Sequence, residues 1–250
     1  MPRYLEKVHS NFHPAIREAF EDTAAPSTEL NAQVIRTIID IIVNDLYPAL
    51  SRVFTKEWYQ DRDGDIIRLV VDTIHEYMSD IRGTLSYDMY LCTFAILLDS
   101  FIASYIRIGI QNVLQGSASK IDPASTKRHG FAEAIGRDVQ YLYVHLEELF
   151  TRRDKAYLMN SLRAIEFLGD LATCPDPMDF IPQMWENEIL ASFYYCSTEY
   201  IAGIVSCRKD SDKNMVLRLV PILNLIQTEY HKTVEPPSLL TGTLTDFFYN

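Results

Sequence analysis

Long intervals without proline, filled with apolar residues at three- and four-residue spacing, run through most of this sequence. No proline occurs between Pro48 and Pro123, between Pro123 and Pro175, or between Pro182 and Pro221. Because proline breaks a helix interior, such intervals leave room for long helices. Nowhere do four to eight residues alternate apolar and polar between turn signals, as a half-buried strand would. The sequence therefore predicts an all-α fold, an elongated array of antiparallel helices joined by short polar loops.

The apolar spacing predicts about seven to nine helices. One of them is expected to end at Gly83, since glycine commonly follows the last turn of a helix. Another is expected to begin with Asp122 as its N-cap and Pro123 at the first helical position. The helix that starts near Thr84 would have about thirty residues and a length of roughly 45 Å. We expect helices over residues 30–46, 63–83, 84–115, 122–149, 154–173, 185–204 and 216–230, the last kinked at Pro221.

A break in the helical pattern occurs at Cys174-Pro175-Asp176-Pro177, where two prolines fall within three residues. Chain segments of this kind favour a domain boundary, because they carry no apolar period and cannot continue a helix. We therefore expect a helical bundle over residues 1–174 and a C-terminal helical bundle over 175–250, which could also be continuous with the first.

The charge balance limits the kinds of partner. The 250 residues carry a formal net charge of −11, with 48% hydrophobic and 23% charged residues. An acidic surface repels phosphate backbones and anionic lipid, so no nucleic-acid partner is expected. The most apolar run, Phe94 to Leu98, is followed at once by Asp99. We therefore expect no direct membrane insertion, and membrane contact only through a partner.

The cysteines and the N-terminus indicate a cytoplasmic protein. Four cysteines are scattered along the chain without the spacing of metal ligands, and are expected to be reduced, small apolar residues. The segment Met1 to Lys7 has no apolar core followed by a cleavage site, so no signal peptide is expected.

No motif for catalysis or for a cofactor is present. Glycine loops that cradle phosphates, such as GxGxxG, are absent from the sequence. Asp61-Arg62-Asp63-Gly64-Asp65 partly matches a calcium loop, but its glycine stands in the wrong place, and helix capping explains it better. His9 and His13 lack a third metal ligand. We expect no catalytic residue, no cofactor and no metal.

One enzyme class needs separate mention, because isoprenoid synthases are also all-α and hold magnesium through acidic clusters on helices. No aspartate-rich DDxxD run occurs here, and Pro48 stands where the alternative Asn-Asp motif needs a hydroxyl. An isoprenoid-synthase type of enzyme stays the alternative from another functional class, and another helical adaptor or tether is the alternative among binding proteins.

Several segments follow one another in the order that they have in a known family. They are Val53–Trp58 (VFTKEW), Thr73–Ile81 (TIHEYMSDI), Tyr105–Gln111 (YIRIGIQ), Ala134–Val139 (AIGRDV), Leu142-Tyr143 and Leu149-Phe150. Over roughly residues 30–170 the chain resembles the C-terminal half of exocyst complex component three, the Sec-six type of vesicle-tethering subunit.

The resemblance implies a helical-rod fold and membership of the octameric exocyst, the tether that acts in exocytosis. It implies contacts with other exocyst subunits and with SNARE proteins or their regulators. A cytoplasmic protein, held at sites of exocytosis through its partners, would follow. The resemblance carries no catalytic residue over to this chain.

Two groups of residues are candidate partner-binding sites. An apolar tail follows Pro236-Pro237, and leaving its side chains in water forgoes about 1.5 to 3 kcal/mol each relative to full burial. The tail could fold back beside Leu219, Leu223 and Ile226, or it could bind a groove on a neighbouring subunit. A basic pair could bind an acidic segment or could simply be solvated. The candidates are Leu239, Leu240, Leu244, Phe247 and Phe248 in the tail, and Arg152 and Arg153 in the basic pair.

Overall fold

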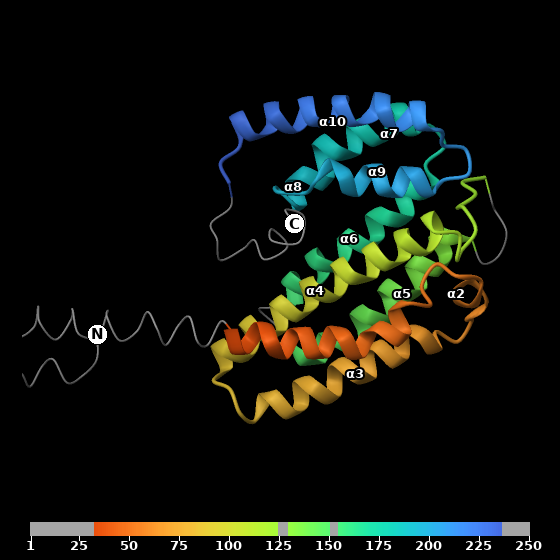
Figure 1. The fold of residues 1–250 in the computed structure, drawn as a ribbon. Coiled ribbons are helices and arrows are strands. Elements are labelled where there is room, and N and C mark those ends of the chain that lie inside the picture. The colour runs from red at the N-terminus through yellow and green to blue at the C-terminus, as the bar shows by residue number, and fades with distance from the viewer. Residues whose placement is uncertain (1–32, 125–129, 151–154, 237–250) are drawn as a thin grey trace, which may run out of the picture. The chain divides into compact units, whose positions relative to one another are not determined.

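The computed structural model describes residues 33–124, 130–150 and 155–236 (Figure 1). Over these residues the chain is helical and holds no strand, so the all-α prediction is confirmed. The chain divides into two compact units, Met1–Ile41 and Ile42–Asn250. Residues 33–50 are helical throughout. All contacts described below lie within the second unit.

The described helices follow one another along the chain, and the longest interval between two of them separates α4 from α5. Their bounds are α2 Lys56–Gln60, α3 Asp65–Arg82, α4 Tyr87–Leu114, α5 Phe131–Leu146, the 3₁₀ turn η3 Glu147–Leu149, α6 Lys155–Thr173, α7 Pro177–Met184, the π-helical turn η4 Trp185–Ile189, α8 Leu190–Ser192, α9 Thr198–Cys207 and α10 Lys213–Thr233.

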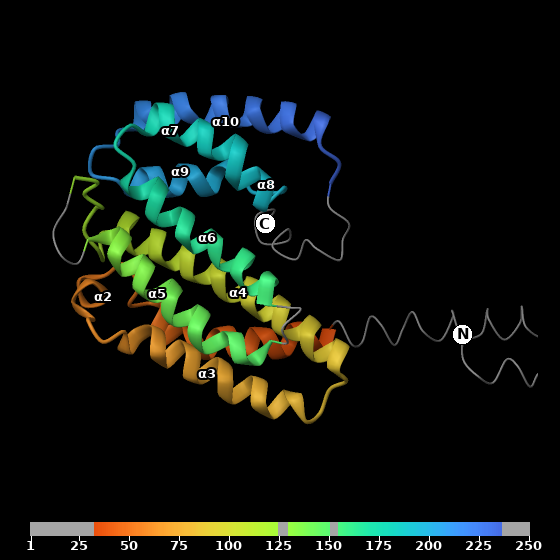
Figure 2. The same ribbon diagram turned by 180° about the vertical axis from the view of Figure 1, so that it is seen from behind.

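The core of the second unit forms between α4, α5 and α6. Helix α6 packs along α5 and against α4, while α9 contacts α4, α6 and α10. Helix α10 lies at the edge of this unit in both views, beyond α7 and α9 (Figures 1 and 2). Its buried face therefore contacts α7, η4 and α9, and its opposite face is not covered by any described helix.

Helix α4 is both long and strongly apolar. Over Met89–Leu114 it is long and apolar enough to cross a membrane by length and composition, with a mean hydropathy of 1.7. Most of that window, 72%, is buried inside the protein. Phe94, Leu98 and Phe101 are fully buried. Burial in the core is thus sufficient to explain the composition of α4.

The ring of Phe54 lies close to the backbone of α4 at Gly109. Phe54 has a positive φ of 62°, a conformation that is strained for a bulky residue. Its ring packs edge-on against Phe131, with the centroids 4.8 Å apart, and lies over Gly109 of α4. A Cβ atom at Gly109 would come within 2.6 Å of Phe54 Cδ2. Glycine is therefore required where the ring crosses α4.

The predicted end of α3 and the predicted capping of its start are confirmed, although the helix begins at Asp65, two residues after the expected start. Gly83 is the C-cap residue of α3, as expected. Asp61 caps the start of α3, because its Oδ1 accepts from the Asp65 N–H at 2.9 Å and its Oδ2 from the Ile66 N–H at 2.8 Å. The acidic segment that partly matches a calcium loop thus acts in helix capping.

The predicted helix start at Asp122 and Pro123 is wrong. Helix α5 begins at Phe131, with Gly130 as its N-cap residue. Asp122 instead closes a local turn, since its Oδ1 accepts from the Ala124 N–H at 3.1 Å. The preceding residue, Ile121, is extended and forms a parallel bridge with Arg208, which is incompatible with a helix there.

The predicted single helix over 185–204 is also wrong. Trp185–Ile189 form a π-helical turn, and the helix ends at Ser192. Phe193 to Ser197 then form a tight turn, in which the Cys196 N–H donates to the Phe193 carbonyl at 2.9 Å. Ser197 starts α9 as its N-cap, because its hydroxyl accepts from the Glu199 N–H at 3.1 Å.

Helix α10 runs through Pro221. Proline has no N–H, so the carbonyl of Leu217, four residues earlier, receives no intrahelical hydrogen bond from it. The division at residues 174 and 175 stays a prediction; Arg208 of the C-terminal part donates to the Leu171 and Cys174 carbonyls.

Candidate interaction surface

The candidate residues from the sequence lie outside the described residues. This holds for Leu239, Leu240, Leu244, Phe247 and Phe248 and for Arg152 and Arg153. Lys155, which follows the basic pair, is described, and its Nζ lies 2.9 Å from Glu147 Oε2. The structure therefore tests neither candidate, and two other features of the described chain supply the geometry below.

The first feature is a buried polar cluster around the carboxylate of Asp138 in α5. The indole N–H of Trp58 donates to Asp138 Oδ2 at 2.7 Å, and the Tyr105 hydroxyl donates to the same oxygen at 2.8 Å. Arg137 donates to the other oxygen, Oδ1, through Nη2 at 3.0 Å and Nε at 3.2 Å. All described hydrogen-bonding positions of the cluster are thus satisfied by helices α2, α4 and α5.

The electrostatics of this cluster follow from its burial. Burial raises the pKa of Asp138, while the hydrogen bond from Trp58 and the charge of Arg137 act in the opposite direction. Burial also raises the pKa of the Tyr105 hydroxyl. Arg137 in addition donates to the backbone carbonyl of Asp61 and lies over the Trp58 ring, 5.8 Å from its centroid. The cluster therefore holds α2 against α5.

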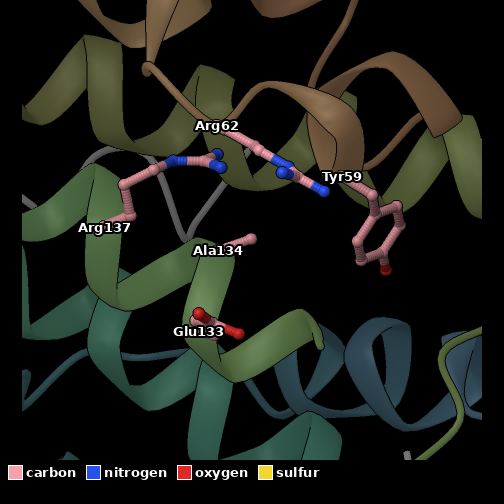
Figure 3. Close-up of a pocket in the computed structure, with 5 residues that line it drawn as sticks. All are labelled: Tyr59, Arg62, Glu133, Ala134 and Arg137. Carbon is pink, nitrogen blue, oxygen red and sulfur yellow. The ribbon is translucent and has the colours of Figure 1, made fainter. Parts of the chain in front are cut away.

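A cavity of about 260 Å³ opens beside this cluster. Figure 3 shows Glu133, Ala134 and Arg137 entering it from α5, and Tyr59 and Arg62 from α2 and the segment after it. The guanidinium of Arg137 is already bonded to Asp138 and to backbone carbonyls. The cluster and the cavity are consequently better explained as parts of the helix packing than as a binding site.

The described residues show no metal centre. No group of three His, Cys, Asp or Glu side chains that could hold an ion occurs in the described ranges. His75 Nε2 lies 2.7 Å from the carbonyl oxygen of His145 and 3.4 Å from Glu148 Oε1, so this histidine links α3 to the end of α5.

The second feature is the outer side of α10, here called the α10 face and defined as Leu217, Pro221, Ile222 and Leu225. Leu217 is 70% exposed and Leu225 64% exposed, the two largest values among the large apolar residues described. Leu217, Pro221 and Leu225 follow at four-residue spacing, which places them in one row along the helix. On the opposite side Leu219 and Leu223 are fully buried, and the Leu223 carbonyl accepts from Trp185 Nε1 at 3.1 Å.

A pocket of about 410 Å³ lies at the N-terminal end of the α10 face. Leu217 belongs to both the face and the pocket, and Leu114 at the end of α4 also lines the pocket. Both leucines are more than half exposed. The remaining lining residues are Lys120, Ser206, Ser211, Asp212, Lys213 and Val216.

Two loops that line this pocket are fixed by backbone hydrogen bonds. The Ile121 N–H donates to the Cys207 carbonyl at 2.9 Å, and the Lys209 N–H donates to the Ile121 carbonyl at 2.7 Å. The loop after α4 is thereby attached to the loop between α9 and α10. Because both loops are hydrogen-bonded, the pocket is a formed feature and not a gap between independent segments.

Arg208 anchors the loop between α9 and α10 from inside. Its guanidinium is fully buried and donates to the carbonyls of Leu171 at 3.0 Å and Cys174 at 2.8 Å. It also forms a bidentate pair with Asp210, at 2.9 and 2.8 Å, which lowers the pKa of that carboxyl. Arg208 therefore caps the C-terminal end of α6 and holds the pocket rim in place.

The charges around the pocket and the α10 face are mainly basic. Lys120, Lys213 and Arg218 make no ion pair with any described residue. The nearby carboxylate of Asp212 accepts from the Met215 N–H at 2.7 Å and so caps α10. No acidic residue occurs in α10 before Glu229. These cations belong to a chain whose formal net charge is −11.

The sequence contained a signal for the α10 face that the helix prediction did not use. The apolar row assigned to the buried side of this helix includes Leu219 and Leu223, and both are buried. Leu217 and Leu225 do not fit that row, and they form a second apolar row on the other side of the helix. Apolar residues left over after the core row is assigned are the pattern that indicates such a surface.

Comparison with known proteins gives one family. A family model described as exocyst complex component Sec6 matches residues 1–213. The match therefore covers most of the chain and ends where α10 begins.

Two curated relatives and one solved structure agree with that model. The chain is 24% identical over 235 residues to exocyst complex component SEC6 of Saccharomyces cerevisiae, covering 93% of this chain and 27% of the relative. It is 33% identical over 76 residues to exocyst complex component sec6 of Schizosaccharomyces pombe, covering 30% of this chain and 10% of the relative. The crystal structure of the C-terminal domain of the exocyst subunit Sec6p superposes with a TM-score of 0.81 at 19% identity, over 98% of this chain and 59% of that one.

Proposed function

Since the chain belongs to the Sec6 family of exocyst complex components, we propose that it acts as part of a vesicle-tethering complex, through protein–protein binding rather than catalysis. The observation that carries the proposal is the family match over residues 1–213. The chain spans about a quarter of the length of the SEC6 relative that it matches over 93% of its own length. Contacts made by the other three quarters of that SEC6 relative are therefore not part of the proposal.

The partners follow from the family. We expect other exocyst subunits to bind the chain, and SNARE proteins or their regulators to be further partners in exocytosis. The protein would then be cytoplasmic and held peripherally at sites of exocytosis through these partners. The exposed apolar row of the α10 face supports a binding role, since large exposed apolar surfaces commonly mark protein contacts.

Binding through the tail and the basic pair remains part of the proposal. The segment 236–250 would either fold back on this chain or enter a groove on a neighbouring subunit. Deleting it should lower the melting temperature in the first case, and should reduce subunit association at unchanged melting temperature in the second. Reversing the charges of Arg152 and Arg153 should weaken binding if they dock an acidic partner; unchanged binding would remove them as a site.

Affinity purification from native cells tests the proposed function. We expect purification of the tagged protein from these cells to recover other exocyst subunits together with it. Recovery of none of them at physiological salt would contradict the proposal. Tight binding of magnesium and a diphosphate by the purified chain would support an isoprenoid-synthase type of enzyme instead.

A further inference from the structure

The α10 face is an apolar row with no described helix against it. Leu217, Pro221 and Leu225 are separated by four residues each, and Ile222 lies beside them at 39% exposure. Leu219 and Leu223, on the opposite side, already attach α10 to the core. The outer row is therefore not required to hold α10 in place.

We propose that the α10 face and the pocket at its N-terminal end dock an acidic amphipathic helix of a partner protein. Leucine-type side chains of the partner would cover Leu217, Pro221 and Leu225, and one or more of its carboxylates would enter the pocket. The proposal rests on the function proposed above, because it names the surface and the partner chemistry through which a tether subunit binds.

The acidic character of the partner follows from the charges that border the face. Lys120 and Lys213 line the pocket, and Arg218 stands on α10 next to Leu217. None of the three is paired with a described carboxylate. Asp212, the acidic residue among the pocket-lining side chains, accepts a hydrogen bond from the Met215 N–H. An acidic segment would thus meet unpaired cations, whereas a basic segment would be repelled.

The position of Lys213 gives a second electrostatic argument. Lys213 is the first residue of α10, and the first turn of this helix contains no acidic residue. A cation at a helix N-terminus is unfavourable, because the helix dipole is positive there. The N-cap residue Asp212 already places one carboxylate at this helix end, and a partner carboxylate in the pocket would pair with Lys213.

The size of the surface fits one short helix. From Lys213 to Leu225 the axis of α10 rises by about 18 Å, which corresponds to roughly twelve residues of a partner helix lying alongside. Such a helix would present apolar residues at three- and four-residue spacing to the face, with glutamates or aspartates on its flanks. The two fixed loops at the pocket give the acidic end of that helix a defined position.

The test uses the whole chain and a designed probe. The probe is a labelled amphipathic peptide of about 18 residues, with leucines at helical spacing and glutamates on both flanks. A second peptide has lysines in place of the glutamates. We expect fluorescence anisotropy to show that the acidic peptide binds about tenfold more tightly than the basic one. The affinity of the acidic peptide should fall as the salt concentration is raised.

Matched variants locate the binding site. Two double variants should each weaken binding of the acidic peptide about tenfold or more. One combines Leu217→Asp with Leu225→Asp, and the other combines Lys120→Glu with Lys213→Glu. The controls are Leu69→Asp on α3, where the leucine is 48% exposed, and Lys56→Glu on α2. Both controls should bind the peptide as the unchanged chain does. All replaced side chains are solvent-accessible, and far-ultraviolet circular dichroism checks that the fold is kept.

Three binding results would overturn the proposal. They are equal binding of the two peptides, equal loss in the Leu69→Asp control, and binding of phosphatidylserine vesicles through the α10 face with no competition from the acidic peptide. Hydrogen exchange of α10 should also be unchanged when residues 237–250 are deleted; faster exchange of the α10 face would make the chain's own tail its occupant. Since exocyst subunits can be recovered whether or not the peptide binds, failure here is distinct from failure of the proposed function.

Discussion

The indole nitrogen of Trp58 and the Oδ2 atom of Asp138 lie 2.7 Å apart, although the two residues are 80 positions apart in the chain. Asp138 is 1% exposed and also accepts from Tyr105 and Arg137. One carboxylate thus connects three helices, and a single substitution can test its contribution.

Replacing Asp138 by alanine should lower the free energy of unfolding by about 3–5 kcal/mol, because Trp58, Tyr105 and the charge of Arg137 would lose their buried acceptor. Urea denaturation followed by circular dichroism measures the change. Asp72→Ala on the exposed side of α3 is the matched control and should change the unfolding free energy by less than about 0.5 kcal/mol. Equal stability of the two variants would show that the cluster does not contribute.

The same carboxylate should give a defined pH dependence. Burial raises the pKa of Asp138, so the folded chain holds its proton to a higher pH than the unfolded chain does. The protonated form of Asp138 therefore stabilises the folded chain. This contribution is fully present below the pKa of the unfolded chain, about 3.9, and is lost as the pH rises through the pKa of the folded chain. Compared with Asp138→Asn, the unchanged chain should lose unfolding free energy over that window. A relative gain with rising pH would contradict the direction of the shift.

Two glycines in helices should respond to alanine in opposite directions. Gly109→Ala places a Cβ within 2.6 Å of Phe54 Cδ2 and should cost about 1–3 kcal/mol of unfolding free energy. At Gly136 in α5 no atom lies within 4 Å of the added Cβ, so alanine should stabilise the helix by about 0.5–1 kcal/mol. Thermal unfolding of both variants compares them directly, and destabilisation by Gly136→Ala would count against the packing described here.

Arg208→Lys should destabilise the chain although it keeps the charge. Lysine cannot make the bidentate pair with Asp210 and also reach the carbonyls of Leu171 and Cys174, so the expected loss is about 2–4 kcal/mol. Hydrogen exchange should become faster in the loop between α9 and α10. Arg218→Lys, at an exposed position of α10, is the control and should leave both readouts unchanged.

Thiol labelling should distinguish Cys92 from the other cysteines. Cys92 is exposed, whereas Cys174, Cys196 and Cys207 are buried. Burial raises the pKa of all three buried thiols, that of Cys207 to about 12, which disfavours the reactive thiolate. Among these four cysteines, iodoacetamide should therefore modify only Cys92 in the native chain, whereas it should modify all four in urea. Peptide mass spectrometry measures the modification of each cysteine. Rapid native labelling of Cys207 would mean that the bridge at Ile121 opens.

The helical class and most helices were predictable because their signals are local. Apolar spacing marks α3, α4 and α6, and Gly83 marks the end of α3. The single helix predicted over 185–204 was wrong because the sequence there agrees equally well with one continuous helix and with two helices separated by a turn. The apolar residues around Phe193 continue the helical spacing on both sides of a break, and only Ser197, a good N-cap, indicated where α9 begins.

The sites were less predictable, since they depend on contacts between distant residues. Nothing near Asp138 in the sequence indicates Trp58 as its donor, and nothing near Ile121 indicates the bridge to Arg208. The exposed row of α10 was partly predictable, because Leu217 and Leu225 exceed what one buried face needs. Which of the two rows faces the core depends on the contacts of α10 with α7 and α9, so it could not be predicted from the sequence of α10 alone.

The contact between Phe54 and Gly109 has a consequence for how this chain can evolve. A larger residue at position 109 collides with the ring, and loss of the ring leaves a hollow between α4 and α5 beside Phe131. Each position therefore restricts the other, although the two are far apart in the chain. Among descendants of this sequence, alanine at position 109 should appear together with a smaller side chain at position 54, and a chain that carries only one of the two changes should be rare.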